Sequence, residues 1–229
     1  MIETPSPNHE PRPPGQAVDM LVLHYTGMQT AQMALERMCD PQAKVSAHYM
    51  IHEDGRVVRL VPEEYRAWHA GLSCWRGQRD INSRSIGIEL VNPGHEWGYR
   101  PFPEAQMAAL IELAQGILAR HPIPSHNVVG HSDVAPARKE DPGELFDWPR
   151  LARHGIGLWS DEQGRSTLTP EQAQALLARI GYDCPVTGEW DEASHLALLA
   201  FQRRFYPSRL DGLLDPGTAH RLKVIARLM

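Results

Sequence analysis

The spacing of apolar and polar residues divides the first two thirds of the chain into alternating strands and helices. Strands are expected over residues 18–25, 85–91 and 127–129, a hairpin over 47–61, and helices over 30–38 and 104–121. The hairpin turn falls at Glu53-Asp54-Gly55 because Asp-Gly supplies the positive φ that tight turns require. Strands interleaved with helices predict an α/β fold, in which helices flank a mixed central β-sheet.

The last third of the chain has only helical patterns and predicts a small all-α unit of three helices. Thr169-Pro170 begins the first helix with an N-cap and a proline at N1, and Gly181 ends it. A repeat follows, in which Gly188-x-x-Asp191-x-x-Ser194 recurs as Gly212-x-x-Asp215-x-x-Thr218. Each Asp is placed to cap a new helix. The small core of this unit is expected from Leu196, Leu199, Phe201 and Phe205.

These patterns predict four segments. Residues 1–17 are an extended Pro-rich arm, because successive prolines enter neither a helix nor a strand ladder. Residues 18–155 form the α/β domain and residues 169–229 form the helical domain. Residues 156–168 lack periodicity and contain many small polar side chains, so they are the expected linker.

Composition narrows the class of protein. The net charge of -5 and the absence of a Lys/Arg-rich block argue against binding to nucleic acid. Cys39, Cys74 and Cys184 are odd in number and widely spaced, so we expect free thiols instead of a disulfide framework.

Targeting signals are also absent from the sequence as it stands. Residues 1–19 have no basic and apolar signal pattern, and no segment approaches the roughly 20 apolar residues of a membrane-spanning helix. The expected location is the cytoplasm, or the periplasm and envelope if a leader has been removed. A monomer is favoured over an oligomer.

Three polar residues stand where the apolar runs end. His24 closes the run 18–23, His131 follows Val128-Val129-Gly130, and Asp141 lies in the irregular segment after it. A strand that ends in His presents its imidazole at the sheet edge. Two imidazoles and one carboxylate leave a bound Zn²⁺ with an open fourth position, which is typical of hydrolytic zinc. Other residues could ligate in principle, namely His48, His52, His69, His95, His126, Asp133 and Glu140.

A lone acid in an apolar strand is the candidate general base. Glu89 lies between Ile88 and Leu90, so strand alternation separates its face from theirs. A buried acid needs a polar partner, and a water on the metal is a suitable one. A buried Arg such as Arg84 could pair with Glu89 instead, or the carboxylate could point to solvent. Asp133 is a candidate to orient a ligating His.

The residues around these positions resemble a known family. The motifs are Val22-Leu23-His24-Tyr25-Thr26, Ser46-Ala47-His48-Tyr49, Ala67-Trp68-His69-Ala70-Gly71, Ser85-Ile86-Gly87-Ile88-Glu89, Val129-Gly130-His131-Ser132-Asp133 and Arg138-Lys139-Glu140-Asp141-Pro142-Gly143. Over residues 18–155 the chain is similar to zinc-dependent N-acetylmuramoyl-L-alanine amidases of the type 2 family, which are related to peptidoglycan recognition proteins. Residues 200–205 and their surroundings resemble a peptidoglycan-binding module.

The resemblance implies roles for several residues. Lys139 would polarise the scissile carbonyl and stabilise the tetrahedral intermediate, although a solvated surface Lys is the ordinary fate of this residue type. Independently of the resemblance, Trp68 and His69 are expected to form a cleft wall, because flat rings pack against sugar or peptide. Asn92, just after the strand of Glu89, is a candidate to hydrogen-bond the stem peptide. A core aromatic is the alternative for Trp68.

The expected function is therefore hydrolysis of the amide bond between the lactyl group of N-acetylmuramic acid and L-alanine. Partners would be peptidoglycan or soluble muropeptides, and the sequence does not decide between them. The alternative is a protein that recognises peptidoglycan without cutting it, which would have lost a zinc ligand. A zinc peptidase is disfavoured because no His-Glu-x-x-His helix is present.

Overall fold

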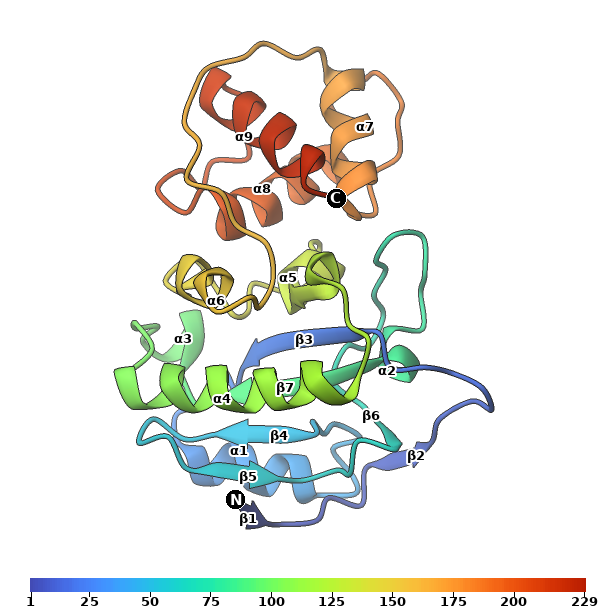
Figure 1. Ribbon diagram of the computed structural model, residues 1–229, viewed down its shortest axis with the longest axis vertical. Coiled ribbons are helices and arrows are strands. Elements are labelled where there is room, and N and C mark those ends of the chain that lie inside the picture. The colour runs from blue at the N-terminus through green and yellow to red at the C-terminus, as the bar shows by residue number, and fades with distance from the viewer.

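A mixed six-stranded sheet lies at the centre of the N-terminal part of the computed structural model, which describes residues 1–229 (Figure 1). The strand order is β1-β5-β4-β7-β3-β8. The strands are β1 (Ile2–Glu3), β3 (Met20–Tyr25), β4 (Tyr49–Ile51), β5 (Val57–Arg59), β7 (Ser85–Leu90) and β8 (Val128–Gly130). Strands β4, β7, β3 and β8 are parallel, whereas β5 pairs antiparallel to β4. The expected α/β fold with a mixed sheet is confirmed.

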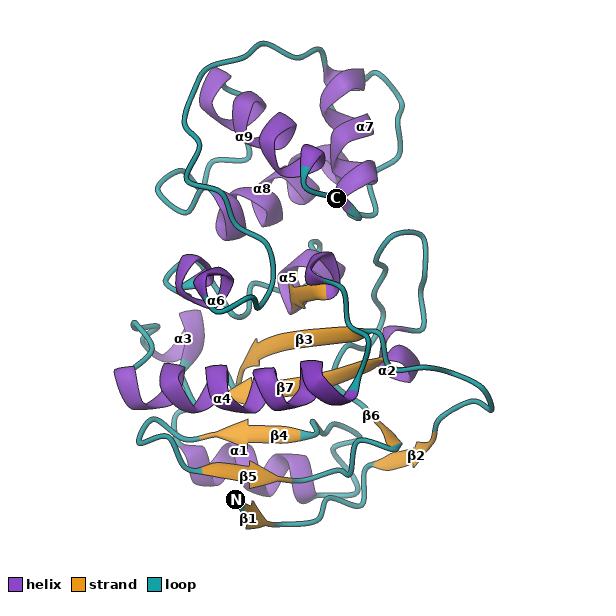
Figure 2. Ribbon diagram, in the orientation of Figure 1, coloured by secondary structure: helices purple, strands orange, loops and turns teal.

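Helices cover both faces of this sheet, as Figure 2 shows. The helices of this part are α1 (Ala31–Cys39), α2 (Ile81–Arg84), α3 (Gly94–Trp97), α4 (Glu104–Arg120), α5 (His131–Val134) and α6 (Trp148–Arg153), with a 3₁₀ turn over Ser125–Asn127. Helix α4 lies in front of the sheet in this view and α1 lies behind it. No helix is long and apolar enough to cross a membrane.

Strand alternation decides which side chains face the functional edge of the sheet. Leu21 and Leu23 pack in the same apolar cluster as α4, so His24 lies on the opposite face of β3. The parallel register pairs His24 with Glu89 of β7, which puts both side chains on that same face. Strands β3, β7 and β8 all end at one edge, where ligand sites of open α/β sheets form.

The N-terminal arm corrects one expectation. It is extended, but it joins two ladders: β1 pairs parallel to β5, and β2 (His9–Pro11) pairs antiparallel to β6 (Tyr65–Ala67). Pro11 lies opposite Tyr65, so the expectation that this arm would stay outside strand ladders was wrong. A two-stranded sheet consists of edge strands, which tolerate a residue that has no N–H to donate.

Three helices form the C-terminal part: α7 (Pro170–Ile180), α8 (Glu192–Phe205) and α9 (Pro216–Arg227). Asp191 and Asp215 accept from the N–H groups of Ser194 and Thr218, so the repeated Asp residues cap α8 and α9 as expected. Phe201 and Phe205 are buried. Leu196 and Leu199 are only half-buried, which corrects the expected core, because the inward face of α8 is built from Ala197, Leu198 and Ala200.

The two parts of the chain share one apolar cluster. Met20, Val22 and Val129 of the sheet belong to the same cluster as Leu177 and Phe201 of the helical part. The segment 156–168 contains no helix or strand and packs along α9, where Ser166 N–H donates to Pro216 O. The division into two domains with this linker remains a prediction. Cys39, Cys74 and Cys184 are free thiols.

The shared cluster gives a prediction for stability. Phe201→Ala removes a fully buried ring and should lower the free energy of unfolding by about 3–5 kcal/mol. Leu196→Ala on the same helix is the matched control and should cost less than about 1.5 kcal/mol. Urea denaturation followed by circular dichroism measures both values. Equal losses for the two variants would contradict the assignment of the inward face of α8.

Candidate metal centre and active-site cavity

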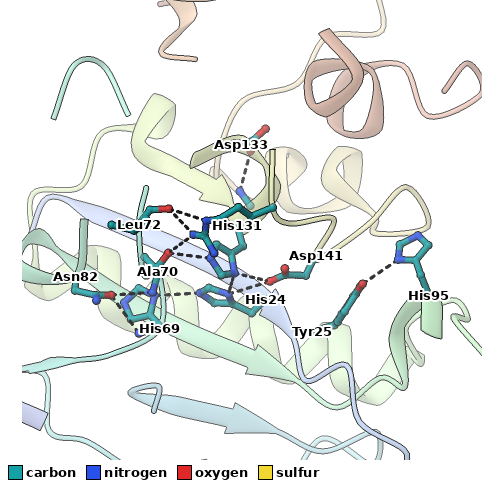
Figure 3. A network of polar contacts seen from close by, with 12 residues as sticks. His24, Tyr25, His69, Ala70, Leu72, Asn82, His95, His131, Asp133 and Asp141 are labelled. Atoms are coloured by element: carbon teal, nitrogen blue, oxygen red, sulfur yellow. Dashed lines mark hydrogen bonds and ion pairs between the residues drawn. The ribbon is translucent and has the colours of Figure 1, made fainter. Parts of the chain in front are cut away.

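Three buried donor atoms meet at the carboxyl edge of the sheet (Figure 3). Nδ1 of His24 lies 3.0 Å from Nδ1 of His131 and 3.0 Å from Oδ2 of Asp141. Nδ1 of His131 lies 3.1 Å from the same Asp141 oxygen. No other group of His, Cys, Asp and Glu side chains in the chain converges in this way. The structure thus brings together the three residues that the sequence singled out.

A chain of hydrogen bonds fixes the protonation of His24. The Ser85 hydroxyl donates to Ile81 O at 2.7 Å, so its oxygen accepts from Nε2–H of His69 at 3.0 Å. Nδ1 of His69 then accepts from Nε2–H of His24 at 3.1 Å. Burial, with smaller effects from the neighbouring histidines, lowers the pKa of His69 well below its usual value, which keeps its ring neutral. His24 is left with an unprotonated Nδ1.

His131 is held in the same tautomer by a different partner. Its Nε2–H donates to the backbone carbonyl of Ala70 at 3.1 Å, so its Nδ1 also carries a lone pair. Burial and the proximity of His131 lower the pKa of His24 to about 4, so a proton does not readily bridge the two rings near neutral pH.

Electrostatics therefore favour a cation between these atoms. Two nitrogen lone pairs and a carboxylate oxygen repel one another at about 3 Å unless a positive charge lies among them. Burial favours the neutral acid, whereas positive charge or N–H groups on the two imidazoles would hold the pKa of Asp141 well below its usual range. With both Nδ1 atoms unprotonated, a cation has to supply that positive charge. A neutral-imidazole pair with an ionised carboxylate fits a metal ion, so this cluster could hold one.

A cavity of about 430 Å³ opens beside the donor atoms. Its lining includes Tyr25, Glu89, His131, Lys139 and Asp141. Arg37, Arg138 and Lys139 supply positive charge to the wall, and Glu89, Glu96 and Glu140 supply negative charge. Two of the donor residues, His131 and Asp141, thus share one solvent-accessible space with Glu89 and Lys139.

Glu89 has an unusual environment for a carboxylate. Its Oε2 is buried and has no hydrogen-bond partner. Burial, and to a lesser extent the nearby Asp141, raise the pKa of Glu89 well above its usual value, while Lys139 opposes the shift. Arg84, the alternative partner, donates instead to Asp19 Oδ1 at 2.7 Å. A carboxylate oxygen that is buried without a partner is costly in a purely structural position and points to a functional one.

Lys139 lies half-buried in the wall of the cavity, two residues before Asp141. It forms no ion pair with any acidic side chain, so its ammonium is available to a ligand. Its position follows from the turn after α5, where the Lys139 N–H donates to Ala135 O at 3.0 Å.

The residues expected to contact substrate have different surroundings. His69 lines the cavity, but both of its ring nitrogens are bonded within the protein, so it orients His24. Trp68 is half-buried and does not line the cavity. Asn92 is buried, and its side chain donates to Arg100 O and accepts from Gly94 N–H, which organises the loop after β7.

The other candidate ligands lie outside the donor triangle. His48 is buried and accepts from Gly87 N–H, and His95 contacts Tyr25 and Glu144. Asp133 does not touch His131, which corrects its expected orienting role; it accepts from Gly130 N–H and from two residues of the helical part. Its side chain points away from the metal donors in Figure 3. The remaining alternatives, His52, His126 and Glu140, are not part of the cluster either.

The sequence analysis did not identify two of the groups that orient the histidines. The Ala70 carbonyl has no sequence signal, because any residue supplies one. Ser85 could have been found, since it shares the face of Gly87 and Glu89 on β7. Gly87 itself makes room for His69, because a Cβ there would lie 2.5 Å from the His69 ring.

Comparison with known proteins finds matches for both parts of the chain. A family model described as N-acetylmuramoyl-L-alanine amidase matches residues 14–144, and a peptidoglycan binding domain model matches residues 169–222. The amidase AmiD of Escherichia coli K12 is 41% identical over 88% of this chain and 79% of its own length. The 1,6-anhydro-N-acetylmuramyl-L-alanine amidase AmpD of Enterobacter cloacae is 36% identical over 64% of this chain and 86% of its own length.

Solved structures extend the similarity to the whole chain. The E. coli AmiD complex with anhydro-N-acetylmuramic acid-L-Ala-D-gamma-Glu-L-Lys matches with a TM-score of 0.82 and 35% identity, covering 95% of this chain and 92% of that one. AmpDh3 of Pseudomonas aeruginosa matches with a TM-score of 0.78 and 33% identity, covering 100% and 99% of the two chains. Together with the donor triangle at the sheet edge, these matches identify the chain as a member of the N-acetylmuramoyl-L-alanine amidase family.

Proposed function

We propose that this chain is a zinc-dependent amidase that hydrolyses the bond between the lactyl group of N-acetylmuramic acid and L-alanine of the stem peptide. His24, His131 and Asp141 would hold the Zn²⁺. The observation that carries the proposal is the unpartnered Oε2 of Glu89, which lies in the same cavity as His131 and Asp141, two of the three residues that supply the donor atoms.

Muropeptides are the proposed substrates. The AmiD and AmpDh3 complexes contain an anhydromuramic acid joined to a peptide. The relative AmpD is named a 1,6-anhydro-N-acetylmuramyl-L-alanine amidase. The helical part, which matches a peptidoglycan binding domain, would add contacts to glycan or peptide.

The reaction needs a nucleophile and a proton acceptor. A zinc ion in this donor set supplies Lewis acidity, which makes water nucleophilic near neutral pH. Glu89 would take the proton from the attacking water and pass it to the leaving nitrogen of L-alanine. Its raised pKa brings its basicity closer to neutral pH than that of an ordinary Glu, which suits both transfers.

Lys139 would stabilise the negative charge that develops on the carbonyl oxygen. Its ammonium has no acidic partner and lines the same cavity, so no internal ion pair has to break when substrate binds. A fixed cation in a partly desolvated site lowers the energy of the tetrahedral intermediate more than it would in water. A protein that only recognises peptidoglycan needs neither this ammonium nor a buried base.

Product analysis tests the proposed reaction. Purified muropeptide should be split into a sugar without peptide and a free peptide that begins with L-alanine, as mass spectrometry would detect. A chelator should abolish the reaction, and added Zn²⁺ should restore it, because the cation is needed among the donor atoms. Running intact sacculi beside the soluble substrate compares the two substrate classes. Binding of muropeptide without any release of peptide would refute the proposal.

Asp141→Ala tests the metal ligands. The variant should lose bound zinc and activity together, because the two imidazoles alone bind the ion weakly. Glu140→Ala is the matched control, since it removes an adjacent carboxylate that lies outside the donor triangle. Zinc content is measured by elemental analysis of the purified proteins. Full zinc occupancy in Asp141→Ala would exclude Asp141 as a ligand.

Glu89→Gln tests the general base. Zinc content should stay unchanged while kcat falls by about 10²–10⁴-fold, because the isosteric amide cannot accept the proton. In the unaltered enzyme, kcat/KM should fall as pH falls through the Glu89 pKa, since only the carboxylate is active. This limb should lie above pH 4.5, the usual pKa of Glu, because burial raises the value. The limb should be missing in Glu89→Gln. If Glu89→Gln keeps the limb unchanged, the limb belongs to the titration of another group.

A further inference from the structure

An arginine of the helical part reaches into the α/β part beside the metal centre. Arg204 of α8 is buried, and its Nη1 donates to Asp133 Oδ2 at 2.8 Å. Its Nη2 donates to the backbone carbonyl of Val128 at 2.9 Å. The guanidinium also lies 4.2 Å from the centre of the Trp148 ring. Arg204 therefore holds the last strand and the short helix that follows it at the same time.

A tyrosine of the helical part holds the same carboxylate. The Tyr182 hydroxyl donates to Asp133 Oδ1 at 2.6 Å, and burial raises the pKa of Tyr182 well above its usual value, so it keeps its proton. Asp133 Oδ2 also accepts from Gly130 N–H at 2.8 Å. A fully buried carboxylate is stable only with such partners, and both of its side-chain partners come from the helical part.

The segment that these bonds hold carries one metal donor, His131. Gly130 and Asp133 flank His131, the first residue of α5. The next residue along, Ser132, donates its N–H to Asp141 O at 2.9 Å. The hydrogen bonds of Arg204 and Tyr182 thus hold the backbone that places His131. Through Ser132, the same backbone also contacts Asp141.

We propose that Arg204 and Tyr182 are positioning residues for the metal centre, acting through Asp133. The helical part would then complete the hydrolytic unit, in addition to any contact that it makes with peptidoglycan. This inference rests on the proposed function for the presence of the metal.

Metal affinity of the full-length chain tests the proposal. Co²⁺ replaces Zn²⁺, its dissociation constant is measured by competition with a chelator, and its visible absorption spectrum reports the ligand geometry. Arg204→Gln should weaken Co²⁺ binding by about tenfold, the lower end for partners that support metal ligands, and should alter the spectrum. Tyr182→Phe keeps the ring packing and should give a smaller change in the same direction. Arg204→Lys keeps the charge beside Asp133 and should recover part of the affinity.

Two control variants separate positioning from general stability. Arg79→Gln removes the Arg79–Asp183 ion pair, which crosses between the same two parts without touching Asp133. Arg221→Gln removes a half-buried arginine of α9 that bonds Ser160 O in the segment 156–168. Both controls should bind Co²⁺ with the affinity and the spectrum of the unaltered chain, even where the melting temperature falls.

Each outcome decides the matter. Unchanged affinity and spectrum in folded Arg204→Gln and Tyr182→Phe would overturn the positioning role while leaving the proposed amidase intact. Equal losses in the control variants would also overturn it, because the effect would then be general destabilisation. If Arg204→Gln does not fold, Tyr182→Phe alone decides. An unaltered chain that binds no divalent ion would refute the proposed function itself, and this inference with it.

Discussion

The parallel pairing of β3 with β7 is the contact on which the rest of the site depends. Its register sets His24 opposite Glu89, so a metal donor and a proton acceptor project from the same face of the sheet. Side chains alternate along a strand, and a slip of one residue would turn Glu89 toward the apolar layer under α4. Strand β8 on the other side of β3 delivers His131 to the same edge. Apolar packing on the sheet face under α4 therefore determines which side chains project from the opposite face, where His24 and Glu89 lie.

The buried polar groups around the paired strands β3 and β7 are of two kinds. The N–H groups of the histidines all have acceptors: His24 donates to His69, His69 to Ser85, and His131 to the Ala70 carbonyl. These bonds fix the tautomers and limit ring rotation, so the lone pairs are aimed before any ligand arrives. Glu89 is left without a partner for Oε2. An unsatisfied group of this kind is unfavourable for folding but ready for a reaction, and such groups gather at functional sites.

The sequence predicted the parts of this arrangement that depend on local signals. Strand-ending histidines, the Asp-Gly turn and the capping residues Thr169, Asp191 and Asp215 could all be found from neighbouring residues, and each lies where it was expected. Contacts between distant segments could not be found in this way. Pro11 pairs with a strand far away in the chain, and the partners of Asp133 are also distant in sequence. The periodicity of apolar residues does not predict such contacts. Leu196 and Leu199 were misplaced because alanines on α8 occupy the inward face.

The contact of Arg204 with β8 and α5 limits how this architecture can be recombined. A chimaera that exchanged the helices after residue 168 for those of another cell-wall protein would leave the buried Asp133 carboxylate without its two side-chain donors. Shuffling such modules, in evolution or in the laboratory, must therefore conserve or replace one arginine and one hydroxyl along with the fold. These contacts couple the two parts of the chain, although each part matches a separate family model.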